Sequence, residues 1–260
     1  MFYKCVGCGA CVRVCEQHAI KADAPGGPVI QDFKQCIHCM KCVSVCPNRA
    51  RAQIGRCADA REIFREIERD RSFFRRGGGG VTLSGGEILL QAEFAEEILR
   101  LFEDNGIHTA IETSAFGPWE KLERLIIHAE LVFIDIKCVN PVRHRQLTGA
   151  DNQIILENIR RAAKLCEERK KEIILRFPLI PTLNDDDINI LHTARFVKQL
   201  SGEPLLNVLP YHNFGESKYE KIGREYVTKY LNIQKRDDLT RVRDLLIESG
   251  VRYSIGGYDT

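Results

Sequence analysis

Eight cysteines near the N-terminus of this 260-residue chain have the type and spacing of iron ligands. They form two quartets with the same spacing, Cys-x2-Cys-x2-Cys-x3-Cys. The first quartet is Cys5, Cys8, Cys11 and Cys15, and the second is Cys36, Cys39, Cys42 and Cys46. In this spacing three thiolates hold one 4Fe–4S cube, and the fourth reaches a neighbouring cube. We therefore expect two 4Fe–4S clusters, one held by Cys5, Cys8, Cys11 and Cys46 and the other by Cys36, Cys39, Cys42 and Cys15.

The residues around the quartets fit a two-cluster ferredoxin-like domain. Pro47 follows the second quartet, as it does in bacterial ferredoxins. Gly7 and Gly9 are expected to form the tight turn that brings backbone amides towards the sulfurs. A zinc site or chance spacing is the alternative interpretation, and eight matching positions argue against it. The remaining cysteines are interpreted as small packing residues: Cys57, Cys138 and Cys166.

Composition and charge narrow the classes of function. The 38 basic and 36 acidic residues are mixed along the chain and give a net charge of +2, so neither nucleic acid nor anionic lipid is expected as a partner. No uncharged apolar stretch is long enough for a membrane span, and the first residues contain no signal-peptide core. We expect a cytoplasmic protein, in which eleven cysteines indicate metal binding rather than disulfides.

Strand-like and helical segments alternate after about residue 55. The strand-like runs are 80–84, 107–112, 131–136, 172–177, 205–209 and 251–255. Four amphipathic helices are expected between these runs. The first is expected to bury Leu90, Phe94, Ile98 and Leu101, and the second Ile155, Leu156, Ile159, Ala163 and Cys166. The third covers 188–200, and the last carries Leu239, Val242, Leu245 and Leu246 and ends at Gly250. This alternation predicts an α/β fold with a parallel sheet, a barrel or part of one, over 56–260, after a ferredoxin-like domain over 1–55.

Polar residues stand at the ends of five predicted strands. They lie in the segments 84–87, 112–114, 135–137, 176–181 and 211–212. The carboxyl ends of parallel strands meet at one edge of a sheet, where barrels bind their ligands. Each segment alone has an ordinary structural interpretation, such as a turn glycine or a solvated lysine. Five at the same edge favour a ligand site.

The motifs at these strand ends resemble a known family. They are GGGVTLSGGE, IETSAF, FIDIK, LRFPLIPTLND and LPYHNFGESKY. Together with the cysteine quartets they closely resemble the glycyl radical enzyme activating enzymes, a branch of the radical S-adenosylmethionine (SAM) superfamily that includes pyruvate formate-lyase activase. The resemblance covers essentially the whole chain. It implies a partial (β/α)6 TIM-like barrel, reductive cleavage of SAM at a 4Fe–4S cluster, and installation of a radical on a glycine of a partner glycyl radical enzyme. Flavodoxin or ferredoxin is the implied electron donor.

The resemblance also implies the residues that bind the cofactor. The expected set is Gly85, Gly86, Glu87, Asp135, Ile136, Lys137, Arg176 and His212. The Gly85–Glu87 loop would meet the methionyl amino group, Lys137 and Arg176 would pair with the methionyl carboxylate, and His212 would hold the ribose. A cation site near the cofactor is implied at Glu112, Thr113 and Asp135.

One part of the family pattern does not occur in the sequence. This is Cys-x3-Cys-x2-Cys, whose three thiolates leave one iron free for SAM. His18 and Arg49 stand where Cys11-x3-Cys15 and Cys42-x3-Cys46 would need a third cysteine. We therefore expect that the first barrel strand and its cluster loop are missing from the N-terminus. On this expectation no catalytic cluster cysteine is named, and a third 4Fe–4S cluster requires the missing segment.

Three functions remain open at this point. The first is a glycyl radical enzyme activating enzyme that is truncated and inactive as supplied. The second is an iron–sulfur electron-transfer or docking subunit without radical chemistry of its own. The third is a non-functional fragment, whose exposed sheet edge predicts poor solubility. An upstream reading frame that encodes the cysteine triad would favour the first.

Overall fold

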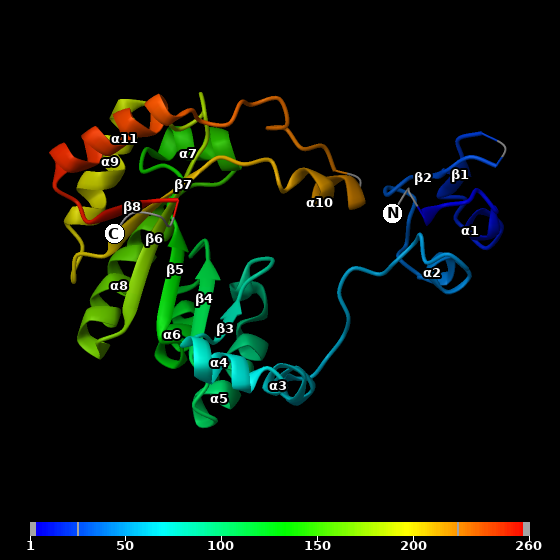
Figure 1. Cartoon of the computed structure of the whole chain (residues 1–260), viewed down its shortest axis with the longest axis horizontal. Helices are drawn as coiled ribbons and strands as arrows, with labels where there is room; N and C mark the ends of the chain where they lie inside the picture. Colours follow the sequence, from blue (N-terminus) through cyan, green and yellow to red (C-terminus); the bar gives the residue numbers. More distant parts are fainter. Residues whose placement is uncertain (1–3, 25, 223, 257–260) are drawn as a thin grey trace. The chain divides into compact units, whose positions relative to one another are not determined.

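The computed structural model describes residues 4–24, 26–222 and 224–256 (Figure 1). Contacts divide the chain into two compact units. Unit 1 comprises Met1–Cys57 and His212–Leu231, and unit 2 comprises Ala58–Tyr211 and Asn232–Thr260. The segment 212–231, which lies within the barrel region proposed from the sequence, is thus grouped by its contacts with the cysteine-rich residues.

Unit 1 contains a short hairpin and three short helices. The hairpin pairs β1 (Ile20–Ala22) with β2 (Val29–Gln31) in antiparallel fashion. The helices are α1 (Ala10–Arg13), α2 (Lys41–Ser44) and α10 (Glu216–Lys221). Each of the first two carries the third cysteine of a quartet. The apolar core is small, with Cys11, Ile20 and Val29 buried at its centre.

The repeat of the two quartets extends to the backbone. Equivalent positions share a positive φ, in the pairs Gly7 and His38 (64° and 55°), Gly9 and Met40 (69° and 60°), and His18 and Arg49 (50° and 49°). The tight turn expected at Gly7 and Gly9 is confirmed by these angles. At Gly7 a side chain is also excluded by space, because a Cβ would lie 2.0 Å from the carbonyl oxygen of Gly26.

Unit 2 is built on a six-stranded sheet in which all neighbouring strands are parallel, in the order β3-β4-β5-β6-β7-β8 (Figure 1). The strands are β3 (Val81–Leu83), β4 (Thr109–Thr113), β5 (Leu131–Asp135), β6 (Glu172–Leu179), β7 (Leu205–Pro210) and β8 (Tyr253–Ile255). Every strand predicted from the sequence is confirmed, with ends that shift by one to two residues at most positions. The predicted parallel α/β architecture is therefore correct.

Helices precede and connect the strands of unit 2. They are α3 (Ala60–Glu68), α4 (Arg71–Gly77), the 3-10 helix η2 (Ile88–Gln91), α5 (Ala92–Asp104), α6 (Trp119–His128), α7 (Pro141–Thr148), α8 (Gln153–Arg169), α9 (Asp187–Lys198) and α11 (Arg236–Ser249). The prediction that Leu90 is buried is wrong. Leu90 lies in η2, before α5 begins, and its side chain is 81% exposed. Gly250 ends α11 with a positive φ, as expected.

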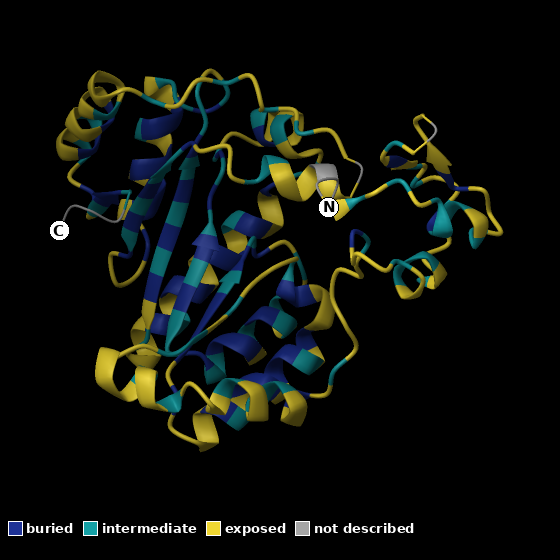
Figure 2. Cartoon of the chain, turned by 45° about the vertical axis from the view of Figure 1, so that its right-hand side comes forward, coloured by how far each residue is buried: buried dark blue, intermediate teal, exposed yellow. Residues whose placement is uncertain are grey.

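Buried and partly buried residues alternate along the longer strands of the sheet (Figure 2). Along β5, Val132 and Ile134 are fully buried, whereas the alternate residues Phe133 and Asp135 are only partly buried. Successive strand residues point to opposite faces, and consecutive right-handed crossovers place their helices on the same face. One face is thus the apolar core beneath the helices. The other carries the polar side chains of the strand ends.

The three cysteines outside the quartets do not share one environment. Cys138 and Cys166 are buried in unit 2, and burial raises the pKa of the Cys166 thiol to about 11. Both are confirmed as packing residues. Cys57 is exposed two residues before Asp59, the N-cap of α3, so its interpretation as a packing residue is wrong.

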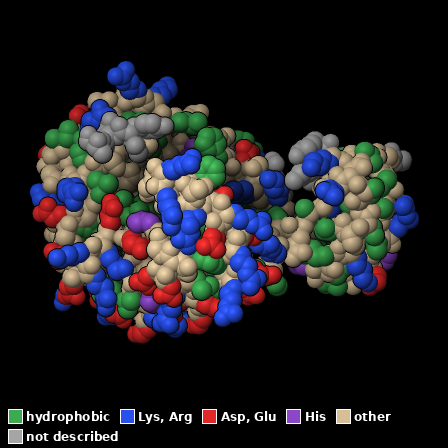
Figure 3. All heavy atoms as spheres, turned by 60° about the horizontal axis from the view of Figure 1, so that its bottom comes forward, with side chains coloured by type: hydrophobic (Ala, Val, Ile, Leu, Met, Phe, Trp, Pro, Cys, Tyr) green, Lys and Arg blue, Asp and Glu red, His purple; other side chains and the backbone are tan. Residues whose placement is uncertain are grey.

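Basic and acidic side chains are interspersed over the face seen in Figure 3. Many of the charges in unit 2 pair locally; for example, the buried Glu96 of α5 binds Arg100 and Arg124. Over the described ranges, no helix combines the length and the apolar character needed to cross a bilayer.

Candidate functional site

Four charged side chains meet where the carboxyl ends of β4 and β5 lie beside the middle of β6. Arg176 Nη1 lies 2.8 Å from Glu112 Oε1, and its Nε and Nη2 lie 3.0 and 2.9 Å from Asp135 Oδ1. Lys137 Nζ lies 3.5 Å from Asp135 Oδ2. The strand register explains the meeting, because Asp135 is directly opposite Arg176 and Glu112 is opposite Phe133, two positions before Asp135. All three strand residues therefore share the face that the core does not use.

This cluster is partly buried and balanced in charge. The Arg176 side chain is 20% exposed and that of Asp135 is 24% exposed. The guanidinium carbon of Arg176 lies 5.4 Å from the ring centroid of Phe133, which covers it from the side of the sheet. The cluster contains two carboxylates and two cations. A ligand carboxylate can therefore bind here by replacing a protein carboxylate as the partner of a cation.

The loop after β3 is fixed by the Glu87 carboxylate. Its Oε1 accepts hydrogen bonds from Thr113 Oγ1 (2.5 Å) and from the amide of Leu89 (3.2 Å). Its Oε2 accepts from the amide of Ser114 (2.9 Å) and from the Ser114 hydroxyl. Four donors occupy the four lone-pair sites of an ionised carboxylate. Glu87 therefore ties the glycine loop to the end of β4, and its carboxylate has no acceptor site left for a ligand.

Replacing Glu87 with Gln is expected to lower the free energy of unfolding by about 1–3 kcal/mol, because an amide NH2 cannot accept the hydrogen bonds that one carboxylate oxygen accepts. Denaturant titration of the full chain measures the change. Glu93→Gln is the matched control, since the Glu93 side chain is 67% exposed and should change stability by less than about 0.5 kcal/mol. Equal losses of unfolding free energy in the two variants would show that the Glu87 hydrogen bonds do not stabilise the fold.

The implied cation site is not formed by side chains. Glu112 and Thr113 are neighbours in β4, so they point to opposite faces of the sheet. Thr113 uses its hydroxyl on Glu87 and on the amide of Ala115, whereas Glu112 and Asp135 share the guanidinium of Arg176. The structure does not bring Glu112, Thr113 and Asp135 together around one point.

The remaining predicted residues occupy different environments. Gly85 has a φ of 122°, and no described atom lies within 4 Å of a Cβ added to it or to Gly86. The Ile136 side chain is in the apolar core, 1% exposed, and its amide donates to the carbonyl of Arg176 (2.8 Å). His212 belongs to unit 1, where its ring stacks on Phe214 with centroids 4.6 Å apart. The side chain of Ile136 therefore does not face the charged cluster.

All eight cysteines of the quartets line one cavity of about 1620 Å³ in unit 1. Residues of the 212–231 segment, such as Ser217 and Arg224, line it as well. Backbone amides point at two of the sulfurs, from Ala50 to Cys46 (3.2 Å) and from His38 to Cys36 (3.4 Å). Thiolates with N–H donors are the environment in which 4Fe–4S clusters are held, so the donor set fits such clusters.

The thiols of Cys11, Cys5 and Cys46 are electrostatic neighbours. Burial raises the pKa of Cys11, the charge of Arg51 opposes the rise, and the Cys5 and Cys46 thiolates add to it. For Cys46, burial also acts to raise the pKa, but hydrogen bonds from the backbone of Asn48, Ala50 and Arg51 outweigh burial and lower it. The electrostatic effect of Cys5 and Cys46 on Cys11 is consistent with the crossed assignment of ligands, which stays a prediction.

Within the described residues, no three Cys, His, Asp or Glu side chains gather closely enough to hold a single metal ion.

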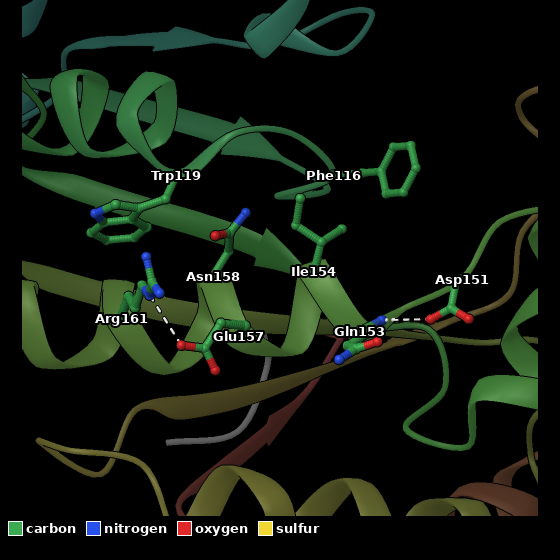
Figure 4. A pocket seen from close by; sticks show the side chains of 8 residues that line it. All are labelled: Phe116, Trp119, Asp151, Gln153, Ile154, Glu157, Asn158 and Arg161. Atoms are coloured by element: carbon green, nitrogen blue, oxygen red, sulfur yellow. Dashed lines mark hydrogen bonds and ion pairs between the residues drawn. The ribbon is translucent and has the colours of Figure 1, made fainter.

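A second cavity, of about 490 Å³, lies between the loop after β4 and the start of α8 (Figure 4). Phe116, Trp119 and Ile154 supply its apolar lining, and Arg161 pairs with Glu157. The buried Asn158 of α8 donates to the carbonyls of Ala115 and Gly117, both at 2.9 Å, and so fixes the loop after β4. The cavity was not predicted from the sequence, where its one signal is an asparagine among the apolar residues of α8.

The chain matches two protein families. The radical SAM superfamily matches residues 35–197, and the 4Fe-4S dicluster domain matches residues 4–50. The (2S)-3-sulfopropanediol dehydratase activating enzyme of Klebsiella oxytoca is 36% identical over 90% of this chain and 74% of that protein. The trans-4-hydroxy-L-proline dehydratase activating enzyme of Clostridioides difficile is 37% identical over 98% of this chain and 83% of that protein.

Solved structures agree with these matches. A domain of a pyruvate-formate lyase-activating enzyme from Bacteroides vulgatus superposes with a TM-score of 0.56 at 30% identity, over 69% of this chain and 99% of that domain. A radical SAM methyltransferase from Sphaerobacter thermophilus has a TM-score of 0.59 at 16% identity, over 78% of this chain and 58% of that chain, which shows the fold alone.

The comparisons confirm the resemblance, but they give no support to the expectation that a cysteine segment has been lost or that the chain is inactive. Cys5, Cys8 and Cys11 are present and lie inside the matched dicluster domain. Iron–sulfur clusters and SAM are the cofactors that the two matched families imply. The chain belongs to the radical SAM superfamily and, with the relatives named above, to its glycyl radical enzyme activating enzymes.

Proposed function

We propose that this chain takes part in installing a glycyl radical on a partner glycyl radical enzyme, by binding SAM at the carboxyl ends of the strands of a partial (β/α)6 barrel. The observation that carries the proposal is the cluster of Arg176, Lys137 and Asp135 on the face of the sheet that the core leaves free. Relatives that match most of the chain are activating enzymes of a dehydratase, which supports a protein partner.

In this proposal each strand end has a separate task. Lys137 and Arg176 bind the methionyl carboxylate through charge-assisted hydrogen bonds. Gly85 and Gly86 approach the amino group with their main chain, since the Glu87 carboxylate is fully used by its four donors. Asp135 holds Arg176 in place, Ile136 contributes only its main chain, and His212 binds the ribose.

The eight cysteines hold two auxiliary 4Fe–4S clusters in the proposal, and flavodoxin or ferredoxin supplies the electrons. The cluster that cleaves SAM is a third one, and its Cys-x3-Cys-x2-Cys ligands are not among these eight cysteines. When bound, SAM and that cluster supply the radical chemistry. The residues of this chain bind the cofactor, orient it and exclude water.

Binding of two nucleosides to the anaerobically reconstituted full chain tests the proposal. SAM carries the amino-acid carboxylate, whereas 5′-methylthioadenosine lacks it. Lys137→Ala is expected to weaken SAM binding about tenfold, the effect of losing one charge-assisted contact, and to leave 5′-methylthioadenosine binding unchanged. Equilibrium dialysis measures both. A chain with intact clusters that binds no SAM would refute the proposed function.

A second candidate is an iron–sulfur electron-transfer or docking subunit. The observation in its favour is that eight cysteines line one cavity while the SAM-cluster spacing does not occur in the sequence. This candidate predicts reversible reduction of the clusters without SAM binding. The same dialysis experiment therefore separates the two functions.

A further inference from the structure

We propose that Asn184 is a positioning residue, which fixes the main chain of Lys137 so that its ammonium group meets the SAM carboxylate. The inference rests on the proposed function, because it concerns the same binding site. Asn184 lies in the loop between β6 and α9, and its side chain is only 2% exposed.

The Asn184 amide joins the ends of two neighbouring strands. Its Nδ2 donates to the carbonyl of Lys137 (3.0 Å), just after β5, and to the carbonyl of Pro178 (2.8 Å) in β6. Its Oδ1 accepts from the amide of Ile180 (2.6 Å). The orientation of the amide follows from its partners, since two carbonyl oxygens can only accept and an N–H can only donate. Asn184 therefore sets the spacing between the strand ends that carry Lys137 and Arg176.

Two further asparagines hold the residues that follow Lys137. Asn152, at the N-terminus of α8, donates to the carbonyls of Cys138 and Val139, both at 2.8 Å. Asn189 of α9 accepts from the Cys138 thiol (3.1 Å) and donates to the carbonyl of Asn184 (2.8 Å). Three consecutive carbonyls, from Lys137 to Val139, are thus bound by buried side-chain amides. A segment held in this way has little freedom to move.

The Lys137 side chain itself is weakly held. It is 38% exposed, and its contact with Asp135 at 3.5 Å is at the outer limit of a hydrogen bond. A long flexible chain with one weak contact does not fix its own ammonium group. The main chain of Lys137, whose carbonyl Asn184 binds, therefore sets the region that the ammonium group can reach. Asn184 lies within the LRFPLIPTLND motif, where nothing in the local sequence indicates this role.

A double-mutant cycle in the full reconstituted chain tests this inference. Asn184→Ala is expected to weaken SAM binding about fivefold to tenfold and to leave 5′-methylthioadenosine binding unchanged. The double variant Asn184→Ala with Lys137→Ala should bind SAM no more weakly than Lys137→Ala alone, because a misplaced ammonium and an absent one are equivalent.

Asn158→Ala is the matched control. Asn158 is also 2% exposed and donates to two carbonyls at 2.9 Å, but those carbonyls belong to the loop after β4. Its effect on SAM binding should be additive with that of Lys137→Ala. If Asn184→Ala does not fold, Asn184→Asp replaces it in the cycle. The aspartate side chain has the same size, but it places a carboxylate oxygen where the amide NH2 donates to two carbonyls.

The outcomes separate this inference from the proposed function. The positioning role would be overturned if Asn184→Ala and Lys137→Ala had additive effects on SAM binding. Equal losses of affinity for SAM and for 5′-methylthioadenosine in Asn184→Ala would overturn it as well. Neither result would contradict SAM binding by the unmodified chain. Absence of SAM binding in the unmodified chain would instead overturn the proposed function, and with it this inference.

Discussion

Replacing Cys8 and Cys46 together with alanine is expected to abolish one 4Fe–4S cluster and leave the other intact. The iron content of the reconstituted chain should fall from about eight to about four atoms, because in the crossed assignment both residues ligate the same cube. The reason lies in the structure, where the thiols of Cys11, Cys5 and Cys46 are electrostatic neighbours although Cys46 belongs to the second quartet. EPR of the reduced protein should then show one unaltered cluster signal.

The companion variant Cys8→Ala with Cys15→Ala distinguishes the two possible assignments. Both residues belong to the first quartet, so an uncrossed assignment predicts that one cluster survives unaltered. The crossed assignment predicts that each cluster loses one thiolate and that both EPR signals change. Cys57→Ala is the control, since Cys57 is exposed outside the quartets and should leave iron content unchanged. One unaltered signal in Cys8→Ala with Cys15→Ala would contradict the crossed assignment.

The fold could be predicted from the sequence because its signals are local and repetitive. Val132, Ile134, Leu175 and Phe177 alternate with less buried residues along β5 and β6, and this alternation identifies both the strands and their core face. The cysteine spacing predicts the cluster ligands in the same way, because spacing along the chain limits which thiols can reach one cube. Patterns of this kind do not depend on distant partners.

The contacts of a side chain could not be predicted where its partner lies on another strand. Glu87 was expected to meet the methionyl amino group, which stays a prediction; that its carboxylate accepts hydrogen bonds from Thr113 of β4 and from Ser114 just after it has no signal in the local sequence. Ile136 follows Asp135 in the FIDIK motif, yet the strand alternation turns its side chain into the core. Asn184 received no role, because nothing in the local sequence shows that its amide reaches the carbonyl of Lys137. The periodicity of apolar residues predicts on which face of the sheet a side chain lies. Its hydrogen-bond partner depends on the register of the neighbouring strands.

Replacing Arg176 with methionine is expected to weaken SAM binding about tenfold to a hundredfold and also to lower the free energy of unfolding by about 1–3 kcal/mol. Both effects have one origin. The guanidinium is a planar fork that spans Glu112 and Asp135, and no other cation described in the cluster lies between these carboxylates. Without it, two partly buried like charges face each other, and one contact to the ligand carboxylate is lost.

A compensating substitution separates stability from binding. Glu112→Gln added to Arg176→Met removes one of the two unpaired carboxylates, so the free energy of unfolding should recover in part, whereas SAM binding should stay weak because no guanidinium is restored. Arg176→Lys keeps the charge but contacts only one carboxylate at a time, and it should fall between Arg176→Met and the unmodified chain in both measurements. Denaturant titration and equilibrium dialysis report the two quantities independently. Recovery of SAM binding together with stability in the double variant would mean that Arg176 acts only by holding the strand ends together, and that the ligand carboxylate is bound by Lys137 without it.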